Sequence, residues 1–333
     1  MGVWDNSISY SDRTAFPFYY ILAPFYQNGA IAVKVFWAIS GFIFFWKYSD
    51  SIYKRSVSSA RFFVLRFSRL YPLHFMTLIT VAILQFFYVS SHNMPFIYDH
   101  NDSQNFVLQL GLASNWLNRQ PYTFNGPIWS ISAEVLAYLF FFIVARFIKP
   151  GLSISIAIVA STRIAIAYHP QIVLICIHFF FSGGLTQQII ARLSRRGRAI
   201  AFWGASGAIV FIIATLYRGH PVTLTYILIL STSIVSWFTL IESANELDMS
   251  KWSWLGDLTY SSYLLHFPIQ LAVVLIIDAL GVDRHIFLSP FTLSLFLFMT
   301  FGAAWITHHH FEMPMQNAIR AVWLSRRPQK VLP

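Results

Sequence analysis

Charged residues are scarce in this chain. They account for 11% of its 333 residues, less than half of the share that is usual in soluble domains, whereas 56% of the residues are hydrophobic and 18% are aromatic. The composition therefore excludes an ordinary water-soluble domain. The net charge of +10 does not indicate nucleic-acid binding, because the basic residues form short clusters between apolar runs of about 20 residues, as they do in membrane proteins.

Cysteine is almost absent, and so are the patterns of a metal site or a secretory signal. The single Cys176 lies in an apolar run, so no intrachain disulfide can form and we expect a small buried side chain. His308, His309 and His310 are consecutive, so they would point in different directions from one helix and would not form a metal cluster. Residues 1–28 have no basic region followed by an apolar one, and they resemble a loop and not a signal peptide.

The sequence is dominated by long apolar stretches. A bilayer core about 30 Å thick requires roughly 20 mostly apolar residues per helix, and nine stretches of the chain qualify. They are residues 30–48, 72–90, 128–148, 152–168, 171–190, 199–217, 222–241, 259–280 and 287–308. Strands cross a bilayer only in closed barrels, and these runs do not alternate polar with apolar residues. The sequence therefore predicts an all-α fold, a polytopic integral membrane helical bundle.

The basic residues predict how this bundle is oriented. Residues 47–69 hold six basic residues against the single acid Asp50, and residues 191–198 hold four arginines and no acid, so both segments belong on the cytoplasmic side. The alternation of spans then places the long loop at 91–127 outside and the carboxyl-terminal tail inside.

No repeat, low-complexity tract or second domain is evident in the sequence. We therefore expect a single membrane domain over residues 1–333. Its parts are an external loop at 1–28, a membrane bundle at 29–314 and a cytoplasmic tail at 315–333.

Glu134 is a carboxylate about six residues into an apolar span, which is roughly 9 Å along the helix axis. A charge at that depth costs about 3 kcal/mol or more unless it is paired or protonated. Glu134 is therefore either a packing partner, with Arg163 as the candidate cation, or a group that orients substrate or handles a proton. Trp129, Ser130 and Ser132 add polar groups at the same helix entrance and favour a functional role.

Histidines also lie within the apolar stretches. His266 is seven residues into its span, and Pro268 weakens the helix there and frees a carbonyl group. His266 can be a site residue or a core residue whose hydrogen bonds are satisfied by its surroundings. We expect His74 and His178 to be packing or interfacial residues.

Arg66 and Arg69 stand at the border of a span. They are three residues apart, so on a helix they share one face and could grip one phosphate group through paired hydrogen bonds. The alternative is that they anchor the span on its cytoplasmic side.

Five segments, taken in chain order, resemble the integral-membrane acyltransferase family 3. GAIAVKVFWAISGFIFFWKY resembles the family's glycine-to-SGF helix, and RFFVLRFSRLYPLHF resembles its arginine-x-x-arginine segment before a tyrosine-proline pair. GPIWSISAEVLAYLF resembles its helix with two serines and a glutamate, LGDLTYSSYLLHFPI its late glycine-to-histidine-x-proline helix, and HHHFEMP its closing glutamate-x-proline. Together the five segments cover about residues 29–314.

This resemblance implies a bacterial inner-membrane enzyme with ten helices and a cytoplasmic carboxyl terminus. Such enzymes carry an acyl group, commonly acetyl, from a cytoplasmic acyl-CoA donor to a hydroxyl of a surface or exported polysaccharide. The implied partners are acyl-CoA (acetyl-CoA), a polysaccharide or lipid-linked glycan and membrane lipid, with neither nucleic acid nor a metal. Direct transfer and transfer through a transient acyl carrier are both open. The alternatives are a polytopic glycoconjugate transporter without covalent chemistry, or an inactive fragment.

The resemblance also assigns roles to residues. It implies that Arg66 and Arg69 face the donor's phosphates and that Ser132 and Glu134 line the transfer region. Trp129 and Ser130 are further candidates for substrate contacts at the same helix entrance. His266 matches a recurrent family position and is a candidate catalytic residue.

The chain departs from the family pattern at its start. The family's first helix carries an arginine and a histidine that is regarded as catalytic, and this chain begins inside the loop that follows that helix. We therefore expect the chain to be truncated or altered in catalysis. A truncation predicts one more apolar helix encoded upstream of Met1.

Overall fold

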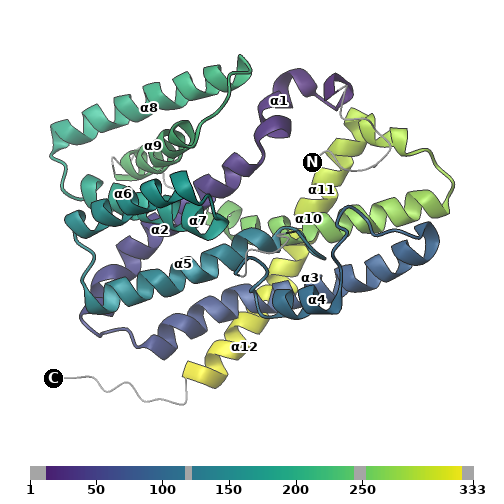
Figure 1. Cartoon of the computed structure of the whole chain (residues 1–333), viewed down its shortest axis with the longest axis horizontal. Coiled ribbons are helices and arrows are strands. Elements are labelled where there is room, and N and C mark those ends of the chain that lie inside the picture. The colour runs from purple at the N-terminus through teal and green to yellow at the C-terminus, as the bar shows by residue number, and fades with distance from the viewer. Residues whose placement is uncertain (1–12, 117–121, 244–252, 325–333) are drawn as a thin grey trace. The chain divides into compact units, whose positions relative to one another are not determined.

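The computed structural model describes residues 13–116, 122–243 and 253–324 (Figure 1). These residues form helices and loops, and no strand occurs among them. The prediction of an all-α helical bundle is confirmed.

Twelve α-helices and three short helical turns make up the described chain. In chain order they are η1 (Arg13–Ala15), α1 (Tyr19–Asn28), α2 (Ala30–Tyr53), α3 (Ser59–His92), α4 (Ser103–Leu110), α5 (Ile128–Phe147), α6 (Leu152–Tyr168), α7 (Ile172–Ile190), α8 (Arg195–Tyr217), α9 (Leu224–Ser243), α10 (Ser253–Ala279), η3 (Arg284–Leu288), α11 (Pro290–Thr307), η4 (His308–Glu312) and α12 (Met313–Leu324).

Eight helical stretches of the described chain are long and apolar enough to cross a membrane. The predicted span at 152–168 forms α6, an apolar helix of 17 residues that is shorter than those eight. The last stretch runs from Pro290 to Leu324 and extends well beyond the predicted span at 287–308, because η4 joins α11 to α12 without a break. The architecture is that of a multi-pass membrane protein.

The amino-terminal segment differs from its prediction in one respect. Residues Tyr19–Asn28 were expected within a loop, and they form the helix α1. The 10 residues of α1 make about three helical turns, and a helix of that length is too short to span a bilayer. The external location of residues 1–28 stays a prediction.

The chain divides into two compact units, which are described separately. The first unit contains Phe18–Ser56 and the described residues of Ser130–Lys251. The second unit contains Val57–Trp129 and the described residues of Gly2–Pro17 and Trp252–Pro333. Each unit combines stretches that are far apart in the sequence. The single domain over residues 1–333 stays a prediction.

Close contact between α2 and α7 organises the first unit. A Cβ atom added at Gly41 would lie 1.8 Å from the carbonyl oxygen of Phe180, and one added at Gly183 would lie 1.8 Å from that of Ala38. Glycine is therefore required on both helices, as is common where membrane helices approach closely. Gly41 belongs to the SGF segment of the sequence, which thus has a packing role. Stacked and edge-on rings continue this contact toward α5, namely Phe44, Tyr138, Phe141 and Phe180.

We expect Gly41→Ala to destabilise the protein by at least about 1 kcal/mol, because the added methyl group meets backbone that cannot rotate away. Gly204→Ala in α8 is the matched control, since a Cβ atom there meets nothing within 4 Å. Thermal unfolding of the purified variants in detergent would measure the difference. Equal stability of the two variants would contradict the close packing of α2 on α7.

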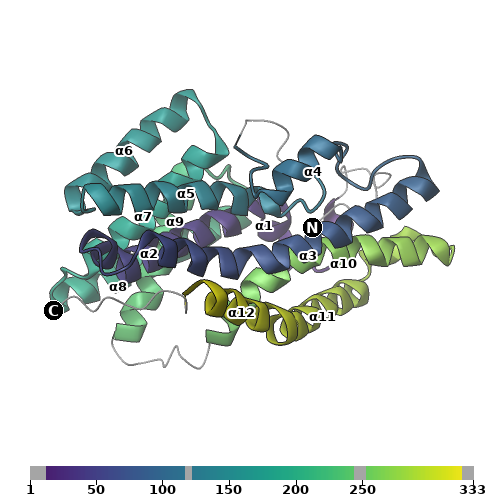
Figure 2. The ribbon, with the colours of Figure 1, turned by 90° about the horizontal axis from the view of Figure 1, so that it is seen from below.

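Helices α3, α10, α11 and α12 pack together in the second unit, and Figure 2 shows the two yellow helices α11 and α12 alongside α3 and α10. Helices α3 and α10 run in the same direction. Near their starts, the Tyr260 hydroxyl donates a hydrogen bond to the Leu70 carbonyl. Near their ends, His92 of α3 lies 3.1 Å from the carboxylate of Asp278 in α10.

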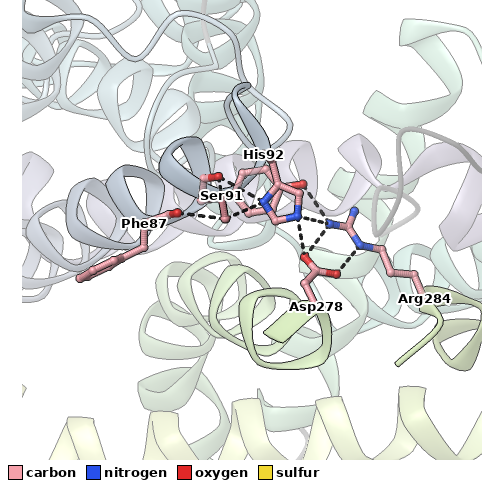
Figure 3. A network of polar contacts seen from close by, with 6 residues as sticks. Phe87, Ser91, His92, Asp278 and Arg284 are labelled. Carbon is pink, nitrogen blue, oxygen red and sulfur yellow. Dashed lines mark hydrogen bonds and ion pairs between the residues drawn. The ribbon is translucent and has the colours of Figure 1, made fainter. Parts of the chain in front are cut away.

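An ion-pair network joins the ends of α3 and α10 (Figure 3). The guanidinium of Arg284 in η3 donates two hydrogen bonds to the Asp278 carboxylate, at 2.8 and 2.7 Å, and a third to the Tyr88 hydroxyl at 3.0 Å. His92 stacks on Tyr88 with ring centroids 4.1 Å apart and contacts the same carboxylate. This paired arrangement fixes the ends of the two helices to each other.

Candidate functional site

The arginine segment lies near the start of α3. The helix begins after Ser58, whose side chain accepts a hydrogen bond from the backbone N–H of Arg61. Arg66 and Arg69 follow on the helix and are both half-buried. Arg69 forms no ion pair with any residue that the structure describes. A half-buried guanidinium without an acidic partner is suited to hold an anion that arrives from outside the protein.

A row of polar side chains faces inward along η4 and α12. It consists of His308, Glu312, Gln316 and Arg320, at intervals of four residues, and is called the polar stripe below. Gln316 donates to Glu312 at 3.0 Å, and Arg320 donates to Gln316 at 2.7 Å. Nδ1 of His308 lies 3.3 Å from the Glu312 carboxylate.

The polar stripe is tied to both neighbouring helices. The Ser261 hydroxyl of α10 donates to the Glu312 carboxylate at 2.5 Å. The Nε atom of Arg320 donates to the hydroxyl of Ser68 at 3.0 Å, and Ser68 directly precedes Arg69 in α3. The stripe therefore connects α10 with the arginine segment of α3 inside the second unit.

The backbone of η4 gives the stripe its direction. Residues His308–Glu312 form a π-helical turn, which holds more residues per turn than an α-helix and often occurs at functional positions. The side chains of His308 and Glu312 are buried, whereas His309 and His310 are exposed. The three consecutive histidines thus diverge, as the sequence predicts.

The local structure around His266 follows from a proline. Pro268 lacks an N–H, so it leaves the carbonyl of Leu264, four residues earlier, without its helical partner. The Asn125 side chain donates to that carbonyl at 3.2 Å, and α10 continues through the proline. The freed carbonyl that the sequence predicts is therefore present and has a partner.

The ring of His266 is oriented by its own helix. Its Nδ1 lies 2.7 Å from the Tyr263 carbonyl, and because a carbonyl only accepts, Nδ1 carries the proton in this contact. The neutral ring then has its lone pair on Nε2, the atom that can accept a proton. His266 is half-buried and lies about 9 Å along α10 from Tyr260. The Tyr260 hydroxyl in turn contacts the carbonyl of Leu70, the residue that follows Arg69 in α3.

A buried polar layer lies beside this part of α10. Nε2 of His74 is 2.7 Å from the backbone carbonyl of Gln109, whose side-chain amide donates to Thr123 Oγ1 at 3.0 Å and to the Asn125 carbonyl at 3.4 Å. His74 is thus a buried packing residue, as expected, and its hydrogen bond fixes α4 against α3. Nδ1 of His74, Oε1 of Gln109 and Oδ1 of Asn125 are buried without a hydrogen-bond partner in the described chain. All three accept hydrogen bonds in this arrangement, so they would be satisfied by water or by a hydroxyl group.

The other predicted residues lie on α5. Ser130, Ser132 and Glu134 are buried, with only 2% of Glu134 exposed, and Trp129 is half-buried. The carbonyl of Trp129 accepts a hydrogen bond of 2.9 Å from Asn115. Helical spacing places Ser130 and Glu134, four residues apart, on one face.

Arg163 was the alternative partner for Glu134. Its side chain is exposed on α6, whereas Glu134 is buried. The pairing of Glu134 with Arg163 stays an alternative to a functional role.

The structure thus brings Arg66, Arg69 and His266 into the second unit, whereas Ser130, Ser132 and Glu134 belong to the first. Whether the two groups meet at one site stays a prediction. The sequence analysis missed the contributions of Ser68, Ser261, Gln316 and Arg320. A signal was present for the last two, since polar residues recur every four positions from His308 to Arg320.

Comparisons with known proteins agree with the segments found in the sequence. A stretch of 115 residues is 35% identical to the acyltransferase MdmB of Streptomyces mycarofaciens, which covers 34% of this chain and about a quarter (27%) of that relative's length. No solved structure matches the chain. Residues 4–309 match the family model described as an acyltransferase domain. Because this match covers nearly all of the chain, the protein belongs to the integral-membrane acyltransferase family 3.

Proposed function

We propose that this protein transfers an acyl group, acetyl in the simplest case, from acyl-CoA to a hydroxyl of a surface or exported polysaccharide or glycoconjugate. The observation that carries the proposal is the half-buried pair Arg66 and Arg69 in a member of an acyltransferase family. Coenzyme A is an anionic donor whose phosphates suit arginine side chains. The basic segment around the pair supports an entry of the donor from the cytoplasm in a bacterial inner membrane, with the carboxyl terminus on the same side.

The reaction defines what the site has to supply. The hydroxyl oxygen of the acceptor attacks the thioester carbonyl carbon, its proton passes to a base, and the carbon–sulfur bond breaks as coenzyme A leaves as a thiolate that takes up a proton. Nε2 of His266 supplies a basic atom in the second unit. Direct transfer and transfer through an acylated protein group satisfy the same balance of atoms.

Glu134, Ser132, Ser130 and Trp129 complete the proposal as residues of the transfer region. The buried carboxylate of Glu134 can orient the acceptor hydroxyl or handle its proton. The two serines and the indole of Trp129 add hydrogen-bond donors for sugar hydroxyls. No step of the reaction requires a metal ion.

The test of this function is the release of free thiol from acetyl-CoA by the purified protein. We expect release that depends on both the protein and a glycan acceptor. A glycoconjugate transporter would bind the glycan and leave the thioester intact. Absence of thiol release with a panel of bacterial polysaccharides and lipid-linked glycans would contradict acyl transfer and favour the transporter.

We expect Arg69→Ala to weaken the affinity for the donor by about tenfold, the effect of losing one charge-assisted contact worth about 1.5 kcal/mol. Arg66→Ala should have a smaller effect, and lysine at either position should restore part of the affinity, because it keeps the charge but cannot form paired hydrogen bonds. Titration calorimetry with coenzyme A measures these affinities. Equal affinity of the wild type and both alanine variants would show that the two arginines only anchor the span.

A further inference from the structure

We infer that the start of α8 binds the headgroup of an anionic phospholipid through Arg195, Arg196 and Arg198, which are called the α8 cluster below. The acyl chains of this lipid lie against apolar side chains that follow on the same helix. The inference concerns a lipid site on the first unit, and it does not depend on the proposed acyl transfer.

The first step concerns the charge of the α8 cluster. Residues 191–198 hold four arginines, no lysine and no acid. The three arginines of the cluster are exposed, and none forms an ion pair with a residue that the structure describes. Glu242 lies close to the end of α9, the helix that packs on α8, and it takes part in none of those ion pairs either. The positive charge is therefore available to an anion from outside the protein.

The second step concerns the local structure that presents the α8 cluster. Ser194 caps the helix, since its side chain accepts a hydrogen bond of 3.2 Å from the backbone N–H of Gly197. The helix begins at Arg195, so all three arginines lie within its first turn, about 4.5 Å along the axis. Guanidinium groups gathered in this way suit a phosphate group, which arginine binds through paired hydrogen bonds.

The third step concerns the side chains that follow the cluster. Arg196, Ile200 and Trp203 are four and three residues apart, so they share one face of α8. Ile200 and Trp203 are exposed at 74% and 72%, whereas Ala205 and Ile212 of the same helix are buried. One face of α8 thus carries a cationic group at its end and an apolar surface beyond it. This order matches the anionic head and the apolar chains of a phospholipid.

The competing interpretation is that the α8 cluster only orients the helices in the membrane. Orientation requires an excess of basic residues on one side and no particular lipid. A lipid site instead predicts a preference for an anionic headgroup at this place on α8. That preference should depend on the α8 cluster and not on basic residues elsewhere in the chain.

The experiment measures lipid contact at Trp203 by quenching of its fluorescence. The full chain is reconstituted in phosphatidylcholine vesicles that contain a rising fraction of either phosphatidylglycerol or phosphatidylcholine with brominated acyl chains, which quench tryptophan on contact. The chain holds 11 tryptophans, so the signal of Trp203 is the difference between the wild type and Trp203→Phe. The two quenching curves give the affinity at this place for phosphatidylglycerol relative to phosphatidylcholine.

We expect the wild type to prefer phosphatidylglycerol at Trp203 by about tenfold, as for several arginines beside an anionic headgroup. Glutamine at all three positions of the α8 cluster should bring the two affinities close to equality. Lysine at the same positions should keep part of the preference, because it retains the charge but cannot form paired hydrogen bonds. Arg196→Gln, a single change of an exposed side chain, should lose part of it with the folded structure intact.

The matched control is the joint replacement of Lys54, Arg55 and Arg61 by glutamine, which removes the same charge from three exposed residues outside the α8 cluster. We expect this control to keep the preference at Trp203. Equal affinities for the two lipids in the wild type, or a preference that the cluster's glutamine variant keeps, would overturn the inference in favour of orientation alone. Absence of quenching of Trp203 by either lipid would also overturn it, because protein would then cover this face of α8.

Titration calorimetry with coenzyme A separates a lipid site from a donor site. We expect the glutamine variant of the α8 cluster to bind coenzyme A as the wild type does. A loss of that affinity with an unchanged lipid preference would assign the cluster to the donor and overturn the inference. Failure of the protein to transfer acyl groups would leave the lipid preference in place, so the inference and the proposed function fail separately.

Discussion

Replacement of His266 by asparagine is expected to lower the rate of acyl transfer by about a hundredfold or more, the lower bound of what a positioned general base contributes. The amide nitrogen of asparagine can still donate to the Tyr263 carbonyl, as Nδ1 of the histidine does. The substitution therefore removes chiefly Nε2, the atom with the lone pair. We expect the affinity for coenzyme A to stay near that of the wild type. Single-turnover measurements of glycan acylation separate the chemical step from donor binding.

His178→Asn is the control for this prediction. Nδ1 of His178 lies within hydrogen-bond distance of the Val159 carbonyl and the Thr162 hydroxyl, and the residue is buried in α7 of the first unit. We expect that variant to lose stability without a specific loss of the chemical step. A His266→Asn protein with a normal rate and a lower unfolding temperature would show that His266 is a core residue.

Glu134→Gln is the second substitution with a large expected effect. The amide keeps the shape of the buried side chain and removes its charge and basicity, so the protein should assemble normally. We expect glycan acylation to fall by at least tenfold, equivalent to about 1.4 kcal/mol of activation free energy. The initial rate of acetyl transfer at saturating donor and acceptor measures this loss.

Glu242→Gln provides the comparison, because Glu242 is exposed on α9 and should be neutral for activity and stability. A normal rate in Glu134→Gln, accompanied by a lower unfolding temperature, would identify Glu134 as a structural partner in the helix bundle. Loss of rate without loss of stability would place it in the transfer region.

The helices were the most predictable part of this protein. Runs of about 20 apolar residues leave few alternatives to membrane helices, since the backbone polar groups must be satisfied within the segment. The predicted stretch 152–168 forms the apolar helix α6 of 17 residues with the same bounds. The exception is α1, which forms a helix where a loop was expected.

The candidate site was predictable only where single residues are unusual for a membrane. Arg66, Glu134 and His266 stand out because charged and titratable groups are costly in an apolar span. The carbonyl freed by Pro268 was also predictable, because proline chemistry acts over a fixed distance of one helical turn.

The polar stripe was not predicted, although each of its residues is visible in the sequence. Glu312 and Gln316 are four residues apart, a spacing that places side chains on one helix face, but no rule of α-helical spacing anticipates the π-turn at His308–Glu312. The bond between Arg320 and Ser68 joins residues 252 positions apart and depends on the packing of α12 on α3. Tertiary contacts of this kind follow from the fold and not from local pattern.

The most direct measurement of acyl transfer follows the acyl group itself. Purified protein in nanodiscs is given acetyl-CoA with a ¹³C-labelled acetyl group and a glycan acceptor, and the glycan is then analysed by mass spectrometry and NMR. The proposed function predicts labelled O-acetyl groups on the glycan in amounts that match the free coenzyme A released, and it predicts their near absence with Glu134→Gln. Release of coenzyme A without label on any glycan hydroxyl, or uptake of glycan without release, would contradict it.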